Sequence, residues 1–345
     1  MNKKILSVVS LVLVFLMLVA CGGGEKAPES TAPESSAPES TAPESTAPES
    51  EAPTTDWPTK PITVIVPAGA GGDTDLNTRV FCKFLQEELG QTVVVSNIKG
   101  MAVAFDEIAK AANDGYTVGS YHPGMFVANT LGTTDKKWDE SYEFCNVFAN
   151  DKQTAWLVSS KSDIKTLDDL IAKSKEQPIG FATEVGSVSH LTQLMFMQLV
   201  EGSQFNIVDA GGSADKITAL LSGQLDLMYN QMGLVKDYLT NGDFVALGVM
   251  AEERSENWPD VPTFKEQGVD MVFDKPYWIF FPKDTDQAIV DKMNEAIAAV
   301  CANPDYAAEL SETMQTVPGD MTPDEAVTYL KDIEATYVDL LSALK

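Results

Sequence analysis

The stretch I-T-V-I-V-P-A-G-A-G-G-D-T-D, residues Ile62–Asp75, decides the fold of this chain. Its first five residues form a β-branched run that is typical of a buried strand, and Pro67 and a glycine-rich loop then end it. From Thr74 onward, apolar residues recur at helical spacing until Gly90. A strand, a glycine loop and a helix in this order predict one unit of an α/β fold.

The same alternation of strand and helix patterns continues along the chain. We expect further strands at Val93–Val95, Tyr116–Tyr121, Ile179–Ala182, Asn206–Val208, Leu225–Tyr229 and Val245–Val249. Helices are expected at Phe105–Ala112, Val188–Val200, Ile217–Leu221, Gln287–Ala302 and Pro323–Leu344. Repeated βαβ units predict parallel sheets covered by helices. Because the chain exceeds the length of one ordinary domain, we expect two α/β lobes.

The first 20 residues have the pattern of an export signal. Two lysines precede the apolar stretch Ile5–Leu18, which is shorter than the ~20 residues that a transmembrane helix needs. The stretch ends in Leu18-Val19-Ala20-Cys21, which resembles the lipobox of bacterial lipoproteins. We therefore interpret residues 1–20 as a lipoprotein signal peptide and Cys21 as the lipidated residue. The alternative is an ordinary secretory signal with an incidental cysteine. Either way the folded part works outside the cytoplasm, and lipidation would anchor it to the cell membrane, on the periplasmic side or the outer face.

A repetitive segment follows the cysteine. Five pentads of A-P-E-S-T type run from Ala27 to Glu51. Regular proline and glutamate prevent a packed core and favour an extended, self-repelling chain. Residues 21–56 are therefore predicted to be a lipid-anchored, disordered linker.

The composition excludes several classes of partner. The formal net charge is -27, and such a field repels nucleic acid and anionic membrane surfaces. Arg79 and Arg254 are the only arginines, so an anionic ligand must be held mainly by backbone N–H groups and hydroxyls. The four cysteines show no C-x-x-C spacing, and we expect neither a metal nor a cofactor.

Three segments repeat one design, in which a strand, a loop of small residues and a helix start follow each other. They are Pro67–Asp75, Thr183–His190 and Asp209–Asp215. In parallel sheets such loops gather at the carboxyl ends of the strands, where ligands bind. Glycines let backbone N–H groups approach a ligand, and a helix N-terminus favours a carboxylate or phosphate. The three loops together predict an anion-binding cleft.

Motifs along the chain resemble those of a known family. They are W-P-T-K-P-I-T-V-I-V-P at 57–67, G-G-D-T-D at 71–75, D-G-Y-T at 114–117, G-S-V-S-H-L at 186–191, G-Q-L-D-L-M at 223–228 and E-R-S-E-N-W-P-D-V-P-T at 253–263. In this order and spacing they resemble the substrate-binding proteins of tripartite tricarboxylate transporters, also called the Bug family. The resemblance covers Trp57–Ala326.

The resemblance implies a type II periplasmic-binding-protein fold, with two α/β lobes that close over a ligand cleft. We place lobe 1 at residues 57–158 and 276–345, and lobe 2 at 159–275. The resemblance also implies that the protein is a monomer and not an enzyme. It would capture a small organic carboxylate (dicarboxylate, tricarboxylate or amino acid). The ligand would pass to a permease of one large and one small integral membrane subunit, driven by an ion gradient. The alternative is a sensor component that presents the bound solute to a signalling receptor.

The resemblance further assigns the cleft residues by matching position. The first-lobe loop would contribute Gly71, Gly72, Asp73, Thr74 and Asp75. The opposing lobe would contribute Thr183, Gly186, Ser187, Ser189, Gly211, Gly212, Tyr229 and Asn230.

This chain departs from the family pattern in its acidic loops. Asp209-Ala210-Gly211 stands where relatives usually show Tyr-Lys-Gly, and Asp73 and Glu184 add further acids. If these side chains face the cleft, a simple tricarboxylate meets like charge without compensation. We then expect a ligand with one carboxylate and a polar or cationic second part, such as an amino acid. The alternative is that the three acids face solvent or cap helices.

Overall fold

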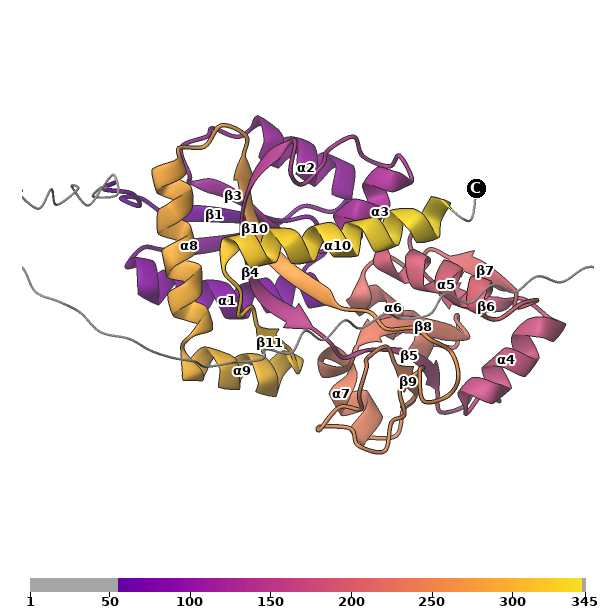
Figure 1. Cartoon of the computed structure of the whole chain (residues 1–345). Coiled ribbons are helices and arrows are strands. Elements are labelled where there is room, and N and C mark those ends of the chain that lie inside the picture. The colour runs from indigo at the N-terminus through magenta and orange to yellow at the C-terminus, as the bar shows by residue number, and fades with distance from the viewer. Residues whose placement is uncertain (1–54, 343–345) are drawn as a thin grey trace, which may run out of the picture. The chain divides into compact units, whose positions relative to one another are not determined.

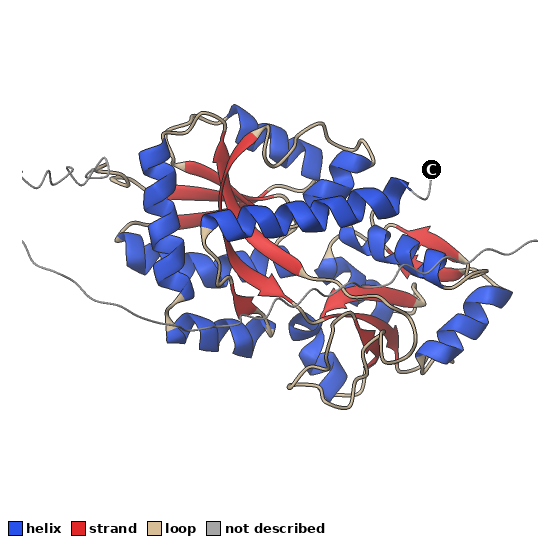
Figure 2. Cartoon of the chain, viewed as in Figure 1, coloured by secondary structure: helices blue, strands red, loops and turns tan. Residues whose placement is uncertain are grey.

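A computed structural model describes residues 55–342 of the protein. The predicted signal peptide, Cys21 and the linker as far as Thr54 lie outside the described residues. The described part contains two β-sheets, each covered by helices (Figures 1 and 2). No helix in this part is long and apolar enough to cross a membrane.

The first lobe is built on a six-stranded sheet. Its strands, in order across the sheet, are β11 (Val317–Pro318), β4 (Tyr142–Asp151), β10 (Lys275–Pro282), β3 (Thr117–Tyr121), β1 (Ile62–Val66) and β2 (Val93–Asn97). Its helices are α1 (Asp73–Leu89), α2 (Met101–Lys110), α3 (Gly124–Thr130), α8 (Gln287–Cys301), α9 (Pro304–Met314) and α10 (Pro323–Ser342).

The second lobe is built on a five-stranded sheet. Its strands, in order, are β7 (Phe205–Val208), β6 (Ile179–Ala182), β8 (Leu227–Gln231), β5 (Thr154–Ser159) and β9 (Phe244–Val249). Its helices are α4 (Leu167–Glu176), α5 (Val188–Leu199), α6 (Ser213–Leu221) and α7 (Met232–Thr240).

Both sheets are mixed rather than fully parallel. In the first, β1 pairs in parallel with β2 and β3, whereas β10 runs antiparallel to β3 and β4. In the second, β6 pairs in parallel with β7 and β8, whereas β5 runs antiparallel to β8 and β9. The prediction of parallel strand pairing is therefore right for the βαβ units. The antiparallel pairs involve the strands next to the passages between the lobes.

The chain passes from the first lobe to the second at Lys152-Gln153 and returns at Lys275, which pairs with Asp151 across the β4–β10 ladder. The expected lobe boundaries are 158/159 for the first passage and 275/276 for the second. The first lies several residues before the expected position, because β5 belongs to the second sheet. Only two residues interrupt the buried run from β4 into β5, so composition does not mark this boundary.

The long helix α10 joins the cores of the two lobes. It contacts α3 of the first lobe and α5 of the second, and Figure 1 shows it in yellow across the first lobe. Tyr337 on α10 stacks on Phe273 with ring centroids 5.5 Å apart, and Phe126 on α3 stacks on Trp278 at the same separation. Each such buried aromatic side chain contributes about 2–3 kcal/mol to folding.

A second contact between the lobes lies behind the cleft, around Gln231 at the end of β8. Its side chain accepts a hydrogen bond from Asn77 on α1 and donates to the carbonyl of Met314 on α9. Beside it, Gly233 lies so close to Met314 that a Cβ atom there would stand 2.0 Å from the Met314 carbonyl oxygen. The lobes are therefore held tightly at this contact, which lies one helical turn along α1 from Asp73, whose carbonyl accepts from the same Asn77 amide.

Candidate functional site

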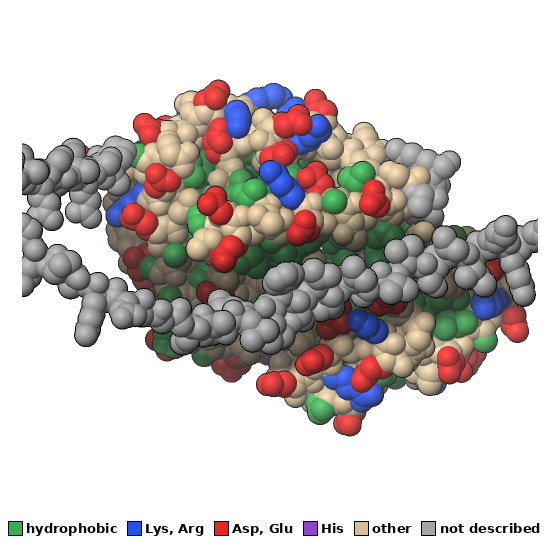
Figure 3. Space-filling model, viewed as in Figure 1, with side chains coloured by type: hydrophobic (Ala, Val, Ile, Leu, Met, Phe, Trp, Pro, Cys, Tyr) green, Lys and Arg blue, Asp and Glu red, His purple; other side chains and the backbone are tan. Residues whose placement is uncertain are grey.

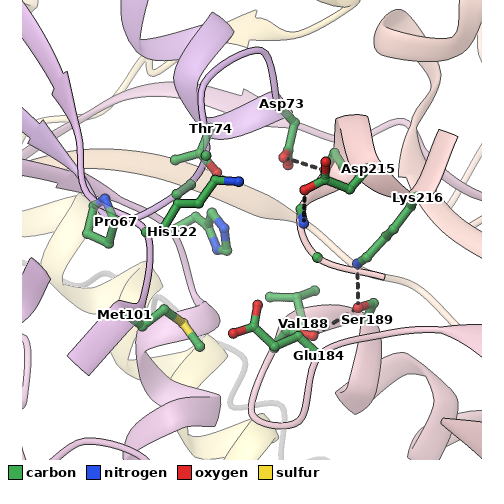
Figure 4. Close-up of a pocket in the computed structure, with 18 of the residues that line it drawn as sticks. Pro67, Asp73, Thr74, Met101, His122, Glu184, Val188, Ser189, Asp215 and Lys216 are labelled. Carbon is green, nitrogen blue, oxygen red and sulfur yellow. Dashed lines mark hydrogen bonds between the residues drawn. The ribbon is translucent and has the colours of Figure 1, made fainter. Parts of the chain in front are cut away.

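A cavity of about 260 Å³ lies where the glycine loops of the two lobes face each other. The first lobe lines it with Pro67, Ala68, Gly69, Gly72, Asp73, Thr74, Lys99, Gly100, Met101, Tyr121, His122 and Lys275. The second lobe lines it with Glu184, Ser187, Val188, Ser189, Asp209, Gly211, Gly212, Ser213, Asp215, Lys216 and Tyr229. Figure 4 shows side chains from both lobes turned toward this space. Its size suits a metabolite smaller than a drug-sized ligand.

Two helices of opposite lobes begin at the cavity with free backbone donors. Both α1 and α6 have a glycine at the N-cap, Gly72 and Gly212, so neither cap offers a side chain to the first turn. Among the described residues, the N–H groups of Asp73, Thr74 and Ala214 have no hydrogen-bond acceptor. Free N–H groups at a helix start bind anions well, because the helix dipole adds to the hydrogen bonds.

The loop before α1 is held in place from beneath by Asp75. Its carboxylate accepts a hydrogen bond of 2.8 Å from the N–H of Gly71, whose φ of 78° a residue with a Cβ rarely adopts. Its other oxygen lies 2.9 Å from Nε of Arg79. Asp75 is buried and does not line the cavity, so it positions the loop rather than contacting a ligand.

Asp73, the acid that does line the cavity on this lobe, is fully compensated. Lys275, only 1% exposed, lies 2.5 Å from its Oδ2, and Tyr277 donates to the same oxygen at 3.1 Å. Burial alone would raise the pKa of Asp73, but the Lys275 charge and the hydrogen bonds from Lys275 and Ser213 together hold the pKa far below its usual range. Lys275 also lies 3.5 Å from Asp151, the last residue of β4. The expectation of an uncompensated charge at Asp73 is therefore wrong.

Asp73 also joins the two lobes across the mouth of the cleft. Its Oδ1 accepts a hydrogen bond of 2.7 Å from the hydroxyl of Ser213, the first residue of α6. The structure thus shows the lobes in contact on the cleft side as well as behind it.

The second lobe presents a cluster of hydroxyls with a lysine. Ser189 shares hydrogen bonds with Thr183 at 2.8 Å and with Ser187 at 2.9 Å. Lys216 on α6 reaches across and donates to Ser189 Oγ at 3.0 Å, as Figure 4 shows. Ser187 also caps α5, because its side chain accepts from the N–H of His190.

Lys216 is buried in the cleft as Lys275 is, but it lacks an ion-pair partner in the part of the chain that the structure describes. It is 6% exposed, yet it forms no ion pair with any carboxylate among residues 55–342. Burial lowers its pKa to about 8, so the side chain is mostly protonated at neutral pH. Asp73, Glu184 and Asp209 oppose this lowering by charge but form no ion pair with Lys216, and an anion that entered the cleft would relieve the remaining cost of burying the ammonium.

His122 contributes a neutral group on the first lobe. Its Nδ1 accepts a hydrogen bond of 3.0 Å from the N–H of Gly124, which leaves Nε2 to carry the ring proton. Burial, with the nearby Lys275 charge, lowers its pKa to about 3. The imidazole therefore offers one hydrogen-bond donor and no charge.

Glu184 and Asp209 line the cleft from the second lobe, and the Lys216 ammonium acts on both only from beyond ion-pair distance. Both line the cavity, and neither forms an ion pair among the described residues. Asp209 accepts one hydrogen bond, from the N–H of Gly211 at 3.1 Å, whereas the Glu184 carboxylate accepts none there. Burial, and then the Asp209 charge, raise the pKa of Glu184. Glu184 is half-buried in the cleft, whereas Asp209 lines the cavity and is also exposed to solvent, so each alternative holds in part.

The structure brings most of the predicted site residues to the cavity. Gly72, Asp73, Thr74, Ser187, Ser189, Gly211, Gly212 and Tyr229 line it. Gly71, Asp75, Thr183, Gly186 and Asn230 lie in the same loops and strands but do not. Tyr229 and Asn230 fall within β8 rather than after it, and Asn230 points away to donate to the Ser213 carbonyl.

Two cavity lysines escaped the sequence analysis. Lys216 lies four residues before the buried Leu220, so helical spacing would have placed it on the buried face of α6. Lys275 is the only charged residue of the strand K-P-Y-W-I-F-F-P, and a lone charge opening such a run is a sign of a buried partner. The expectation that N–H groups and hydroxyls supply the anion contacts therefore did not consider a buried lysine in the cleft.

Comparisons with known proteins support one family. Residues 78–332 match the model described as "Tripartite tricarboxylate transporter family receptor". The protein BugT of Bordetella pertussis is 30% identical over 286 residues, covering 79% of this chain and 86% of that protein. A protein encoded in the gbd 5' region of Cupriavidus necator is 30% identical over 261 residues, covering 73% of this chain and 78% of that protein.

Solved structures agree in fold. The structure of R. palustris Rpa4515 with adipate superposes with a TM-score of 0.78 at 25% identity, covering 83% of this chain and 98% of that one. The periplasmic binding protein BugD superposes with a TM-score of 0.77 at 24% identity, with the same coverage of 83% and 98%. The expected type II periplasmic-binding-protein fold is confirmed. The chain belongs to the tripartite tricarboxylate transporter receptor family, the Bug family of extracytoplasmic solute-binding proteins, whose members are not enzymes.

Proposed function

We propose that this protein captures a small organic carboxylate between its lobes, with Lys216 as the counter-ion of the carboxylate. The observation that carries the proposal is the buried Lys216 ammonium, which lines the cleft and has no carboxylate partner among the described residues. The free N–H groups at the starts of α1 and α6 supply additional donors. The adipate carried by the similar R. palustris protein is a carboxylate of this size class.

The proposal extends to delivery at the membrane. Lipidation of Cys21 and the A-P-E-S-T repeat would hold the binding lobes beside a permease with one large and one small integral subunit. Cys21→Ala should move the protein from the membrane fraction to the soluble fraction. Deleting either permease subunit should abolish uptake while leaving the affinity of the purified protein unchanged.

Lys216→Met tests the carboxylate anchor. We expect the variant to bind pentanoate and adipate at least 30-fold more weakly by isothermal titration calorimetry, since a lost charge-assisted hydrogen bond in a buried site is worth about 2 kcal/mol or more. Lys161→Met is the matched control, because Lys161 is an exposed lysine of the same lobe that lies outside the cavity. Equal affinities for Lys216→Met and the wild type would refute the anchor.

A further inference from the structure

We propose that the ligand carries a cationic nitrogen as well as a carboxylate, and that Glu184 and Asp209 accept this cation. The inference rests on the proposed function, because it assigns the second half of the same ligand. It makes the substrate class a small amino acid or similar zwitterion, rather than a dicarboxylate or tricarboxylate.

The four acids that line the cavity divide into two pairs. Asp73 is neutralised by Lys275. The Asp215 carboxylate accepts a hydrogen bond from the N–H of Gly212 and so caps the N-terminus of α6. Glu184 has neither kind of partner among residues 55–342, and Asp209 forms no ion pair there and accepts only the Gly211 N–H, through Oδ1. The Glu184 carboxylate and the second oxygen of Asp209 therefore remain available to a ligand.

The cations of the cleft do not neutralise this second pair. Lys275 is bound to Asp73, and Lys216 donates to Ser189 and interacts with Glu184 and Asp209 only beyond ion-pair distance. Lys99 lines the first-lobe side and is exposed, with its chain beside Gly69. A dicarboxylate would therefore place four carboxylates around Lys216, the one buried cavity lysine among residues 55–342 that forms no ion pair. A zwitterion would instead match both unpaired signs of charge.

The position of Glu184 favours contact with a ligand. Its side chain extends from the loop before α5 into the space that faces Met101 and His122 of the first lobe (Figure 4). His122 is neutral there, since burial lowers its pKa to about 3, so it neither attracts nor repels a cation by charge. The raised pKa of Glu184 has burial as its main cause and the Asp209 carboxylate as the next, and a ligand cation beside both would oppose these effects.

Five-carbon acids that differ in one group give a direct test. Glutarate, pentanoate, 2-aminopentanoate and 5-aminopentanoate each carry a carboxylate, and only the last two add an ammonium. By calorimetry with the full chain at pH 7, we expect one of the aminopentanoates to bind at least tenfold tighter than glutarate. The Glu184→Gln/Asp209→Asn double variant should lose at least tenfold for that ligand and gain affinity for glutarate, with pentanoate changed by less than threefold.

Glu201→Gln is the matched control, because Glu201 is an exposed acid of the same lobe that lies outside the cavity. A wild type that prefers glutarate, or that binds none of the four probes, overturns the inference. So does a double variant whose ratio of aminopentanoate affinity to glutarate affinity stays within twofold of the wild-type ratio.

Lys216→Met separates the two proposals. If it leaves pentanoate binding unchanged while the double variant still switches selectivity, the carboxylate anchor fails and the cation site stands.

Discussion

The two sides of the cleft carry buried lysines in opposite circumstances. Lys275 of the first lobe lies against Asp73 and Asp151, so carboxylates of the protein itself neutralise its charge. Lys216 of the second lobe is nearly as deeply buried but touches only a hydroxyl. The first arrangement belongs to the folded state, whereas the second is completed by a ligand. A buried charge thus identifies a binding site only when its partner is missing.

The sharpest test of this contrast is the stability of the ligand-free protein. Lys275→Met leaves Asp73 and Asp151 buried without a cation and should lower the free energy of unfolding by about 3–5 kcal/mol. Lys216→Met removes an unpaired charge and should change it by less than about 1 kcal/mol, or raise it. Urea unfolding of both variants measures the difference. Equal losses would show that Lys216 is a structural charge like Lys275.

The pH dependence of binding should also separate the two lysines. Because the pKa of Lys216 is about 8 in the free protein and a bound carboxylate raises it, binding takes up a proton above pH 8. The affinity for pentanoate should be flat from pH 6.5 to 7.5 and then fall by up to about tenfold per pH unit until the pKa of the complex is reached. Calorimetry in matched buffers gives these values. A profile that stays level to pH 10 contradicts the assignment, and Lys216→Met should be level throughout.

A smaller effect is expected where the two sides touch. Ser213→Ala removes the hydrogen bond to Asp73 across the cleft mouth but leaves Lys275 and Tyr277 on that carboxylate. We expect the contact to lose about 1 kcal/mol, which shifts the ligand-free population toward an open form by about fivefold. Small-angle X-ray scattering should report a larger radius of gyration. Ser222→Ala at the other end of α6 serves as the control, because that hydroxyl bonds only within its own helix.

Local patterns predicted most of the elements that surround the site. The strand Ile62–Val66 and the strand Ile179–Ala182 have the expected bounds, because each is a short apolar run ended by a loop signal. The strand β10 was not foreseen, since its eight residues are buried on both faces and show no alternation. β8 begins and ends two residues later than expected, so Asn230 as well as Tyr229 lies inside the strand, where the two side chains point in opposite directions.

The loops of the site were foreseen but their charge balance was not. Glycine and hydroxyl residues reveal a helix start from sequence alone, as at Gly72 and Ser187. Pairing between Asp73 and Lys275 joins residues 202 positions apart, and no local pattern reports such a contact. The same limit hid the absence of a partner at Lys216, because a missing contact is visible only after the fold has brought all candidates together.

The topology of the passages between lobes has one consequence for exchange of parts between relatives. The second lobe leaves the first after Asp151 and re-enters it at Lys275, and these two residues are neighbours on paired strands. The second lobe is therefore an insertion into the first lobe, and the two ends of this inserted cassette lie side by side. Lys216, Glu184 and Asp209 all lie inside that cassette. Transplanting residues 152–274 into a relative would carry the ligand-directed charges as one module and leave the host's own first-lobe loop in place.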